Sequence, residues 1–465
     1  MDVNDVFKNM ESAVNKKRDF FASGRTTDLS FRREQLIKIS KTINKSENEI
    51  YQALNKDLGR SQSESYLAEL LSIKSELAIA IKNLNKWAKK RDIKTSLMHM
   101  PAKSYTLPEP YGVVLIISPW NYPLSLSLIP AISAIAAGNC VIIKPSEYSQ
   151  NTTELLSKLI GDYFESSFIE VITGGPDETK LLLQNKFDYI FYTGGEKVAK
   201  SVMLSAAEHL TPLTLELGGK SPCIFHSTSD LKSAAKRIVW GKFFNAGQTC
   251  VAPDYLLIPT DKKDELVNAL IQTIKDFYGE NAEKSESYSK IINEKHMMRL
   301  TGLLKNSTVL YGGDYNISKR YISPTIIDDV SWDSEIMEEE IFGPILPIIY
   351  YKNISEVISK INSKPKPLAL YIFSNDEAIR KQILNSTYSG GVCINDAVIQ
   401  VASPYLPFGG VGTSGMGSYH GKTGFDTFSH LKSVMERKLG FDAPFRFPPY
   451  QKFSAFMKQM FDLMG

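Results

Sequence analysis

The feature that most limits the fold is a stretch without charged side chains, residues 111–143. A crude hydropathy scan would read it as a membrane span, but the turn PWNYP at residues 119–123 and the pair Gly138-Asn139 interrupt it. Neither apolar piece reaches the ~20 residues that a spanning helix needs. The pattern instead predicts a buried strand (VVLII), a helix and a second buried strand (CVIIK), as in the core of a parallel sheet.

Alternating strand and helix patterns continue on both sides of this stretch. Residues 30–90 have helical periodicity and predict a helical layer. From residue 111 to FDYIFYTGG the strand-helix alternation indicates βαβ units, and a second alternating block runs from LTLELGG to about residue 400. The prediction is an α/β protein with two α/β domains.

Three further segments differ from this pattern. Residues 91–107 combine alternation with Pro and Lys, which favours a hairpin leaving the main body, and the glycine cluster at 407–424 favours a loop beside a site. Residues 452–465 predict an amphipathic helix with an apolar face, formed by Phe453, Phe456, Met457, Met460, Phe461 and Met464. That face could pack on the body or a sister subunit, cap an apolar tunnel, or lie on a membrane surface.

Composition excludes several classes of protein. The 465 residues include 54 Lys and Arg and 51 Asp and Glu, which gives a net charge of +3. This charge is too small to indicate nucleic-acid binding, so a small-molecule partner is expected. The four cysteines form no CxxC pair, which fits neither a disulfide framework nor a structural zinc site and indicates a reducing, cytoplasmic setting. The polar amino terminus lacks the apolar core of a secretory signal.

Three residues have contexts that suggest catalysis. Cys250 in GQTCVAPDY lies in a break between a helix and a strand, whereas the other cysteines lie in apolar strand contexts. Glu216 in LELGG is a general base if buried and a solvated strand end if not. Asn121 in PWNYP could direct its amide N–H at an oxyanion or belong to an ordinary turn. Each residue, taken alone, leaves both readings open.

Two segments suggest a dinucleotide, although the chain has no GxGxxG motif. In FYTGGEKVAK a strand ends at Gly194-Gly195 and a helix begins, so backbone amides there could meet a phosphate. In KPSE, Lys144 and Glu147 could bind ribose hydroxyls or remain solvated charges.

The order of these motifs resembles that of the aldehyde dehydrogenases over nearly the entire chain. PWNYP, KPSE, YTGG, LELGGKSP, GQTC, EEIFGPILP and PFGG follow one another between residues 119 and 410, and GQTCVAPDY, SGMGSYHGK and PPY look like the class 3 branch, which includes fatty aldehyde dehydrogenases. The resemblance implies an NAD(P)-binding Rossmann-like domain (1–90 and 108–213) and a catalytic domain (214–400). It also implies a β bridging and oligomerisation element (91–107 and 401–440) and a carboxyl-terminal tail (441–465).

The same resemblance implies a role for each matching residue. Cys250 matches the nucleophile, Asn121 the oxyanion donor and Glu216 the general base. The implied cofactor contacts are Trp120, Lys144, Glu147, Gly194, Gly195, Val198, Ala199, Glu340 and Phe342. The family turn usually has glycine at the position of Ala199 and a small polar residue at that of Gly195. No metal site is implied.

The implied reaction is oxidation of an aldehyde to a carboxylate through a cysteine thiohemiacetal and thioester. NAD is the expected cofactor because Glu147 would repel a 2′-phosphate, and NADP is the alternative because Lys144 could offset that. The expected substrates are medium- or long-chain aliphatic aldehydes or other apolar ones, aromatic or terpenoid and carotenoid aldehydes included. We expect a homodimer, without a transmembrane segment, and leave peripheral membrane contact open. The alternatives are a coenzyme A-acylating dehydrogenase and a catalytically idle homologue that only binds ligands or has a structural role.

Overall fold

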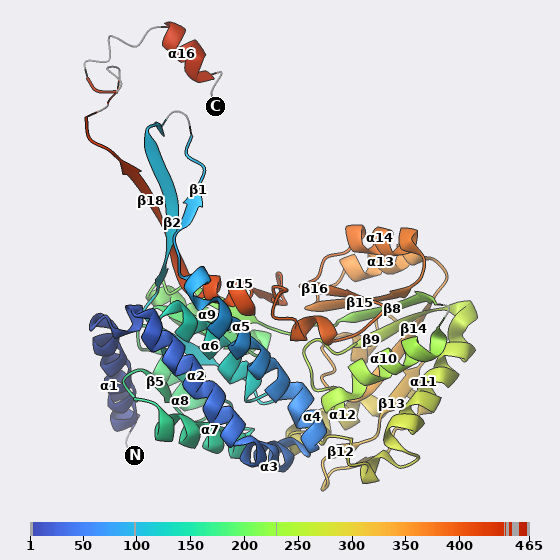
Figure 1. Ribbon diagram of the computed structural model, residues 1–465. Helices are drawn as coiled ribbons and strands as arrows, with labels where there is room; N and C mark the ends of the chain where they lie inside the picture. The colour runs from blue at the N-terminus through green and yellow to red at the C-terminus, as the bar shows by residue number, and fades with distance from the viewer. Residues whose placement is uncertain are drawn as a thin grey trace.

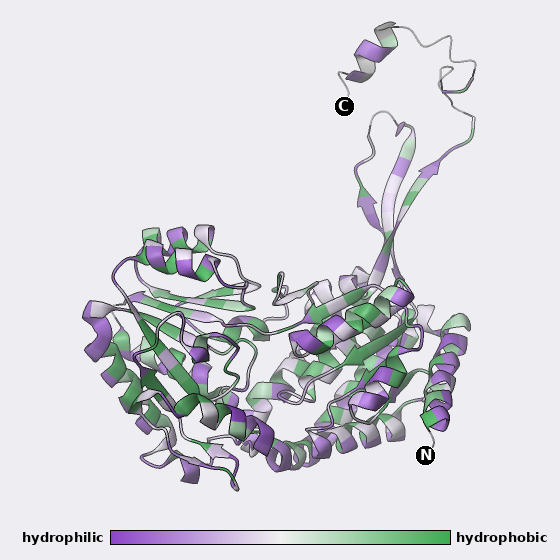
Figure 2. Ribbon diagram, turned by 180° about the vertical axis from the view of Figure 1, so that it is seen from behind, coloured by the Kyte–Doolittle hydropathy of each residue, from purple (hydrophilic) through white to green (hydrophobic). Residues whose placement is uncertain are grey.

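The computed structural model describes residues 3–96, 99–228, 230–440, 442, 446–448 and 455–462. Two α/β bodies lie side by side, and a three-stranded arm projects from the first body (Figure 1). Hydrophobic residues are concentrated on the sheets and the inner helix faces, whereas the outer helix faces are largely hydrophilic (Figure 2). The α/β class predicted from the strand-helix alternation is confirmed.

The first body is built on a six-stranded sheet in the order β17-β7-β6-β3-β4-β5. All neighbouring pairs are parallel except β17 and β7. Its strands are β3 (Val113–Ile117), β4 (Cys140–Lys144), β5 (Ile169–Val171), β6 (Tyr189–Thr193), β7 (Leu213–Glu216) and β17 (Gly415–Met416). The uncharged stretch forms β3, α6 (Ser125–Ala137) and β4, as predicted, and every residue of both strands is buried because helices cover both faces.

Side-chain alternation along β3 divides this body into two cores. Val114 and Ile116 pack on one face with the helices of the amino-terminal layer, while Leu115 and Ile117 pack on the other with residues of α1, α8 and α9. The helices are α1 (Val3–Ala22), α2 (Leu29–Lys45), α3 (Glu47–Leu58), α4 (Gln62–Ser65), the π-helical turn η2 (Tyr66–Leu70), α5 (Leu71–Trp87), α7 (Gln150–Tyr163), α8 (Pro176–Leu183) and α9 (Glu196–Glu208). The helical layer predicted for residues 30–90 is therefore present.

The second body is built on a seven-stranded sheet in the order β10-β13-β14-β9-β8-β15-β16, with only β10 antiparallel to its neighbour. Its strands are β8 (Pro222–Ser227), β9 (Tyr255–Pro259), β10 (Thr308–Tyr311), β13 (Thr325–Asp328), β14 (Ile345–Tyr351), β15 (Ala369–Ser374) and β16 (Gly391–Ile394). The helices are α10 (Leu231–Phe243), α11 (Lys263–Tyr278), α12 (Glu294–Leu304), α13 (Ile354–Asn362) and α14 (Glu377–Ser386), and β11 (Tyr315–Asn316) pairs with β12 (Tyr321–Ile322). The chain enters this sheet after β7, so the boundary expected at residue 213 falls inside a strand of the first body.

The arm consists of β1 (Arg91–Ile93), β2 (Ala102–Pro110) and β18 (Ser429–Arg437), all antiparallel. Residues 91–107 contain the hairpin that their alternation indicated. The expectation that 401–440 belongs as a whole to the bridging element needs correction. Within it β17 joins the first sheet, and α15 (Gly421–Thr427) packs on the first body because Phe425 is buried there.

The amphipathic helix expected in the carboxyl-terminal tail overlaps α16 (Ala455–Asp462), and its flanking residues Phe453 and Met464 lie outside the described residues. Figure 1 shows α16 beyond the tip of the arm, away from both bodies. Among the described helices, none combines the length and the apolar character that crossing a membrane requires.

Candidate active site

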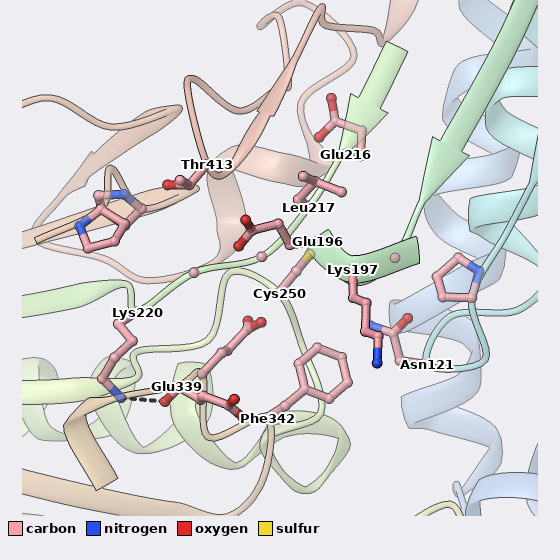
Figure 3. Close-up of a pocket in the computed structure, with 18 of the residues that line it drawn as sticks. Asn121, Glu196, Lys197, Glu216, Leu217, Lys220, Cys250, Glu339, Phe342 and Thr413 are labelled. Atoms are coloured by element: carbon pink, nitrogen blue, oxygen red, sulfur yellow. Dashed lines mark hydrogen bonds between the residues drawn. The ribbon is translucent and has the colours of Figure 1, made fainter. Parts of the chain in front are cut away.

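A cavity of about 910 Å³ lies between the two bodies, at the carboxyl ends of strands β3, β6 and β7. Its walls come from the PWNYP turn, the start of α9, the segment after β7, the Cys250 loop, α12 and residues 337–342. This is where α/β sheets usually bind ligands. Figure 3 shows Asn121, Glu216, Cys250 and Phe342 around this space.

Asn121 is held in place by a buried hydrogen-bond network. Its side-chain Nδ2 donates to the carbonyl of Gln248 at 3.1 Å, and its own carbonyl accepts from Asn245 Nδ2 at 3.2 Å and from Arg60. Arg60 is paired with Glu69 at 2.9 Å, and both side chains are inaccessible to solvent. Because the second N–H of Nδ2 remains available, this carboxamide can act as a fixed donor at the cavity wall.

The Cys250 loop has an unusual backbone. Asn245, Ala246 and Gly247 all have positive φ, at 56°, 51° and 72°, and such strain in non-glycine residues is typical of functional sites. A Cβ at Gly247 would lie 2.3 Å from the carbonyl oxygen of Gly343, so glycine is required where this loop meets the IFGP segment. The loop places Cys250 in the cavity wall, where it also packs against the core of the second body.

The cavity raises the pKa of the Cys250 thiol. Loss of solvent is the main cause, and the charges of Glu340 and Glu216 add to it, while the N–H groups of Cys250 and Val251 act in the opposite direction. The thiol is therefore neutral near pH 7, and a base is needed to generate the thiolate.

Glu216 ends β7 with its carboxylate buried, 2% exposed. Neither carboxylate oxygen has a hydrogen-bond partner among the described residues, and burial raises its pKa well above the ordinary value. A buried carboxyl without a partner is costly, and one with a raised pKa can take up and release a proton near neutral pH. The buried reading of Glu216 therefore holds, and the solvated strand end does not.

Residues 339–342 form the wall opposite the PWNYP turn. Phe342 has a φ of 47°, and its ring lies edge-on to Trp120 at 5.4 Å between centroids. Burial, reinforced by the charge of Asp254, raises the pKa of Glu340 to about 8. Glu340 lies so close to Gly218 that a Cβ there would be 2.0 Å from its Oε2.

The cavity continues to the start of α9, where Gly194 and Gly195 line it. The hydroxyl of Thr193 is buried without a partner among the described residues, and the first amides of a helix have no intrahelical acceptor. These donors fit a phosphate group. A dinucleotide could thus reach from α9 to Phe342.

The remaining predicted cofactor residues lie outside the cavity lining. Val198 is exposed on α9, and Ala199 is buried in the core beneath that helix. Lys144 is buried and donates to the carbonyls of Pro145 at 2.8 Å and Gly174 at 2.6 Å, while Glu147 is exposed. The three candidate catalytic residues thus line one cavity together with Trp120, Gly194, Gly195, Glu340 and Phe342. Lys144, Glu147, Val198 and Ala199 are not part of that lining.

Comparison with known proteins agrees with this geometry. Residues 4–434 match the model of the aldehyde dehydrogenase family. The chain belongs to the aldehyde dehydrogenase family. It is 47% identical to the 4,4'-diaponeurosporen-aldehyde dehydrogenase of Staphylococcus aureus (97% of this chain, 99% of the relative) and 47% identical to the dimeric NADP-preferring aldehyde dehydrogenase of Mus musculus (93% and 95%). A solved substrate-bound structure of Staphylococcus aureus AldH superposes with a TM-score of 0.94 at 47% identity, covering 97% of this chain and 99% of that one.

This aldehyde dehydrogenase is therefore an oxidoreductase that acts on the aldehyde group with NAD(P). Several of its cavity residues were not predicted from sequence: Thr193, Lys220, His296 and Arg299. Lys220 had a usable signal, a charge directly after the LELGG strand end, whereas His296 and Arg299 lie in an ordinary amphipathic helix. Burial lowers the pKa of His296 to about 4, so this imidazole is neutral.

Proposed function

We propose that this aldehyde dehydrogenase oxidises long apolar aldehydes to carboxylates through a thioester on Cys250, with NAD as the cofactor. One observation supports it most directly: Cys250, Glu216 and Asn121, far apart in the sequence, line one cavity. A nucleophile, a buried carboxyl and a fixed amide donor are the groups that acyl chemistry at an aldehyde requires.

In the first step the Cys250 sulfur bonds to the aldehyde carbon and the thiol proton passes to a carboxylate. Glu216 and Glu340 are the carboxyl groups whose charges act on this thiol. The resulting oxyanion accepts hydrogen bonds from Asn121 Nδ2 and the Cys250 backbone N–H. Loss of one such donor typically costs about 3–4 kcal/mol.

The nicotinamide, when bound, supplies the acceptor for the hydride of the thiohemiacetal. Trp120, Glu340 and Phe342 would shape its site, and the donors at Thr193 and the start of α9 would face its pyrophosphate. Glu216 then removes a proton from water as the water oxygen bonds to the acyl carbon. The carbon–sulfur bond breaks, the proton held by Glu216 passes to the Cys250 sulfur, and the acid product releases its own proton to solvent and leaves as the carboxylate.

The proposed preference for NAD rests on Glu147. Its exposed carboxylate follows β4, and the neighbouring Lys144 spends two N–H donors on backbone carbonyls. The charge of Lys144 interacts with that of Glu147, but only one N–H donor of Lys144 remains for a 2′-phosphate that the Glu147 carboxylate would repel.

The proposed substrates are apolar. The similarity to a relative named for 4,4'-diaponeurosporen-aldehyde supports including terpenoid aldehydes beside aliphatic ones. Because α16 lies far from the cavity of its own chain, a cap formed by this helix would have to come from a second subunit. Truncation after residue 451 would then alter long-chain kinetics more than short-chain kinetics. The dimer is proposed from the resemblance and from a relative described as dimeric.

The central test compares Cys250→Ser with Cys393→Ser. Cys393 is the other partly buried cysteine, and it lies on β16 outside the cavity. We expect Cys250→Ser to bind NAD normally and form no NADH with any aldehyde, and Cys393→Ser to keep full activity. NADH production by Cys250→Ser would refute the mechanism.

A second measurement addresses substrate, cofactor and the alternative reaction. Turnover is compared with NAD and NADP over aldehydes of increasing chain length, with and without coenzyme A. Rising kcat/KM with chain length and a carboxylate product support the proposal, while acyl-coenzyme A formation favours the acylating alternative. No turnover across the panel would favour the catalytically idle homologue.

A further inference from the structure

Lys220 lines the cavity but does not offer its charge to a ligand. Its ammonium donates to the carboxylate of Asp254, to the carbonyl of Ile336 at 2.8 Å and to that of Glu339 at 2.9 Å (Figure 3 draws the last). A lysine has three N–H donors, so all of them are used. Lys220 therefore cross-links parts of the protein through hydrogen bonds and has no free donor for a phosphate.

Asp254, the eighth residue of GQTCVAPDY, extends the hydrogen-bond network of Lys220 to further backbone groups. Its side chain is 4% exposed. Oδ2 accepts from Lys220, Oδ1 accepts from the Ile341 N–H at 2.9 Å, and its own N–H donates to the carbonyl of Ser221 at 2.8 Å. The pair thus joins the end of the Cys250 loop, the segment after β7 and residues 336–341.

The anchored backbone groups flank residues whose side chains face the cavity. The backbones of Glu339 and Ile341 bind Lys220 and Asp254, while the side chains of Glu340 and Phe342 line the cavity. Arg299, on α12, also donates to the Ile341 carbonyl at 2.5 Å. These hydrogen bonds hold the backbone on both sides of Glu340, which restricts where the side chains of Glu340 and Phe342 can lie.

The pair also sets the charge around Glu340. Asp254 opposes ionisation of Glu340, whereas Lys220 and Arg299 favour it. Lys242, buried in α10 behind the cavity, and the Cys250 thiol also interact with Glu340. Glu340 in its charged form disfavours the Cys250 thiolate.

We propose that Lys220 and Asp254 are positioning residues that fix Glu340 and Phe342 against the Cys250 loop, and that they thereby control both cofactor affinity and thiol reactivity. The role of Glu340 and Phe342 at the nicotinamide rests on the proposed function. Neither Lys220 nor Asp254 need touch the aldehyde.

The test uses Lys220→Met and Asp254→Asn in the full chain, with Asp328→Asn as the matched control. Asp328 is buried in the same body and pairs with Lys263 at 2.7 Å, but it lies outside the cavity lining. All three changes remove one charge of a Lys–Asp pair. The dissociation constant of NAD is measured by quenching of tryptophan fluorescence, since Trp120 contacts Phe342.

We expect the dissociation constant of NAD to rise about ten- to a hundredfold in Lys220→Met and Asp254→Asn, and less than about twofold in Asp328→Asn. Without cofactor, the two variants should change Cys250 alkylation by iodoacetamide in opposite directions at about pH 8, where Glu340 of the unmodified enzyme is partly ionised. Losing Lys220 keeps Glu340 neutral and speeds alkylation, whereas losing Asp254 ionises Glu340 and slows it. A purely structural role would move both in the same direction.

Unchanged NAD binding in both variants would overturn the proposal, and so would an equal weakening in Asp328→Asn, because loss of stability alone would then explain it. Alkylation that changes in the same direction in both variants would overturn the electrostatic part. These readouts do not depend on turnover. Failure of the proposed function would instead appear as absent aldehyde oxidation by the unmodified enzyme.

Discussion

Gly218→Ala tests whether the position of Glu340 matters for the reaction. A Cβ at residue 218 would lie 2.0 Å from Glu340 Oε2 and 2.7 Å from its Cδ, whereas ordinary van der Waals contact begins near 3.4 Å. The carboxylate must therefore retreat by more than an ångström. The atoms that move are the end of a flexible side chain, so we expect the free energy of unfolding to change by only about 1 kcal/mol.

The same displacement of the Glu340 carboxylate should lower the catalytic rate strongly. A misplacement of about 1 Å can cost about a hundredfold in rate, which corresponds to about 2.7 kcal/mol in the activation free energy. We expect kcat/KM to fall by about that factor and the dissociation constant of NAD to rise, while the melting temperature drops by no more than about 4 °C. Gly302→Ala is the control, because its Cβ would meet nothing within 4 Å and alanine favours the helix.

A double-mutant cycle identifies the route of the effect. If Gly218→Ala acts through Glu340, adding it to Glu340→Ala should change kcat/KM little further. Full additivity of the two changes, or a Gly218→Ala enzyme with normal kcat/KM, would refute the reasoning.

Three further changes test the catalytic roles. Asn121→Ala should lower kcat by about 10²–10³ with NAD binding intact, and a normal kcat would exclude Asn121 as the oxyanion donor. Glu216→Gln should keep a rapid burst of NADH but slow steady-state turnover, because deacylation is impaired; loss of the burst as well would show that Glu216 also acts earlier. Glu340→Gln should speed iodoacetamide alkylation of Cys250 at about pH 9, because the charge that raises the thiol pKa is gone. Below about pH 7 this rate should match that of the unmodified enzyme, whose Glu340 is already neutral with a pKa of about 8, and the exposed Glu335→Gln variant should match it throughout.

Sequence patterns were most informative where the physical signal is local. The charge-free stretch predicted β3, α6 and β4, because a parallel strand covered on both faces must be apolar throughout. Helix α1 was not predicted because its sequence is polar on most of its surface, and only tertiary contacts through residues such as Met10 and Val14 bury its inner face. The extent of the bridging element was overestimated for a similar reason, since Phe425 anchors α15 on the first body.

The sequence by itself determined the α/β class, the family and the choice of Cys250, Glu216 and Asn121 as candidates. Each of these depends on short motifs and on their order along the chain, which the sequence shows directly. Only the tertiary structure decided that these three residues share a cavity and that Val198, Ala199, Lys144 and Glu147 lie outside its lining. It also decided that the Glu216 carboxylate has no partner among the described residues, and that Lys220 and Asp254 tie residues 336–341 to the Cys250 loop. Desolvation and long-range hydrogen bonds arise when distant segments pack together, so no short stretch of sequence encodes them.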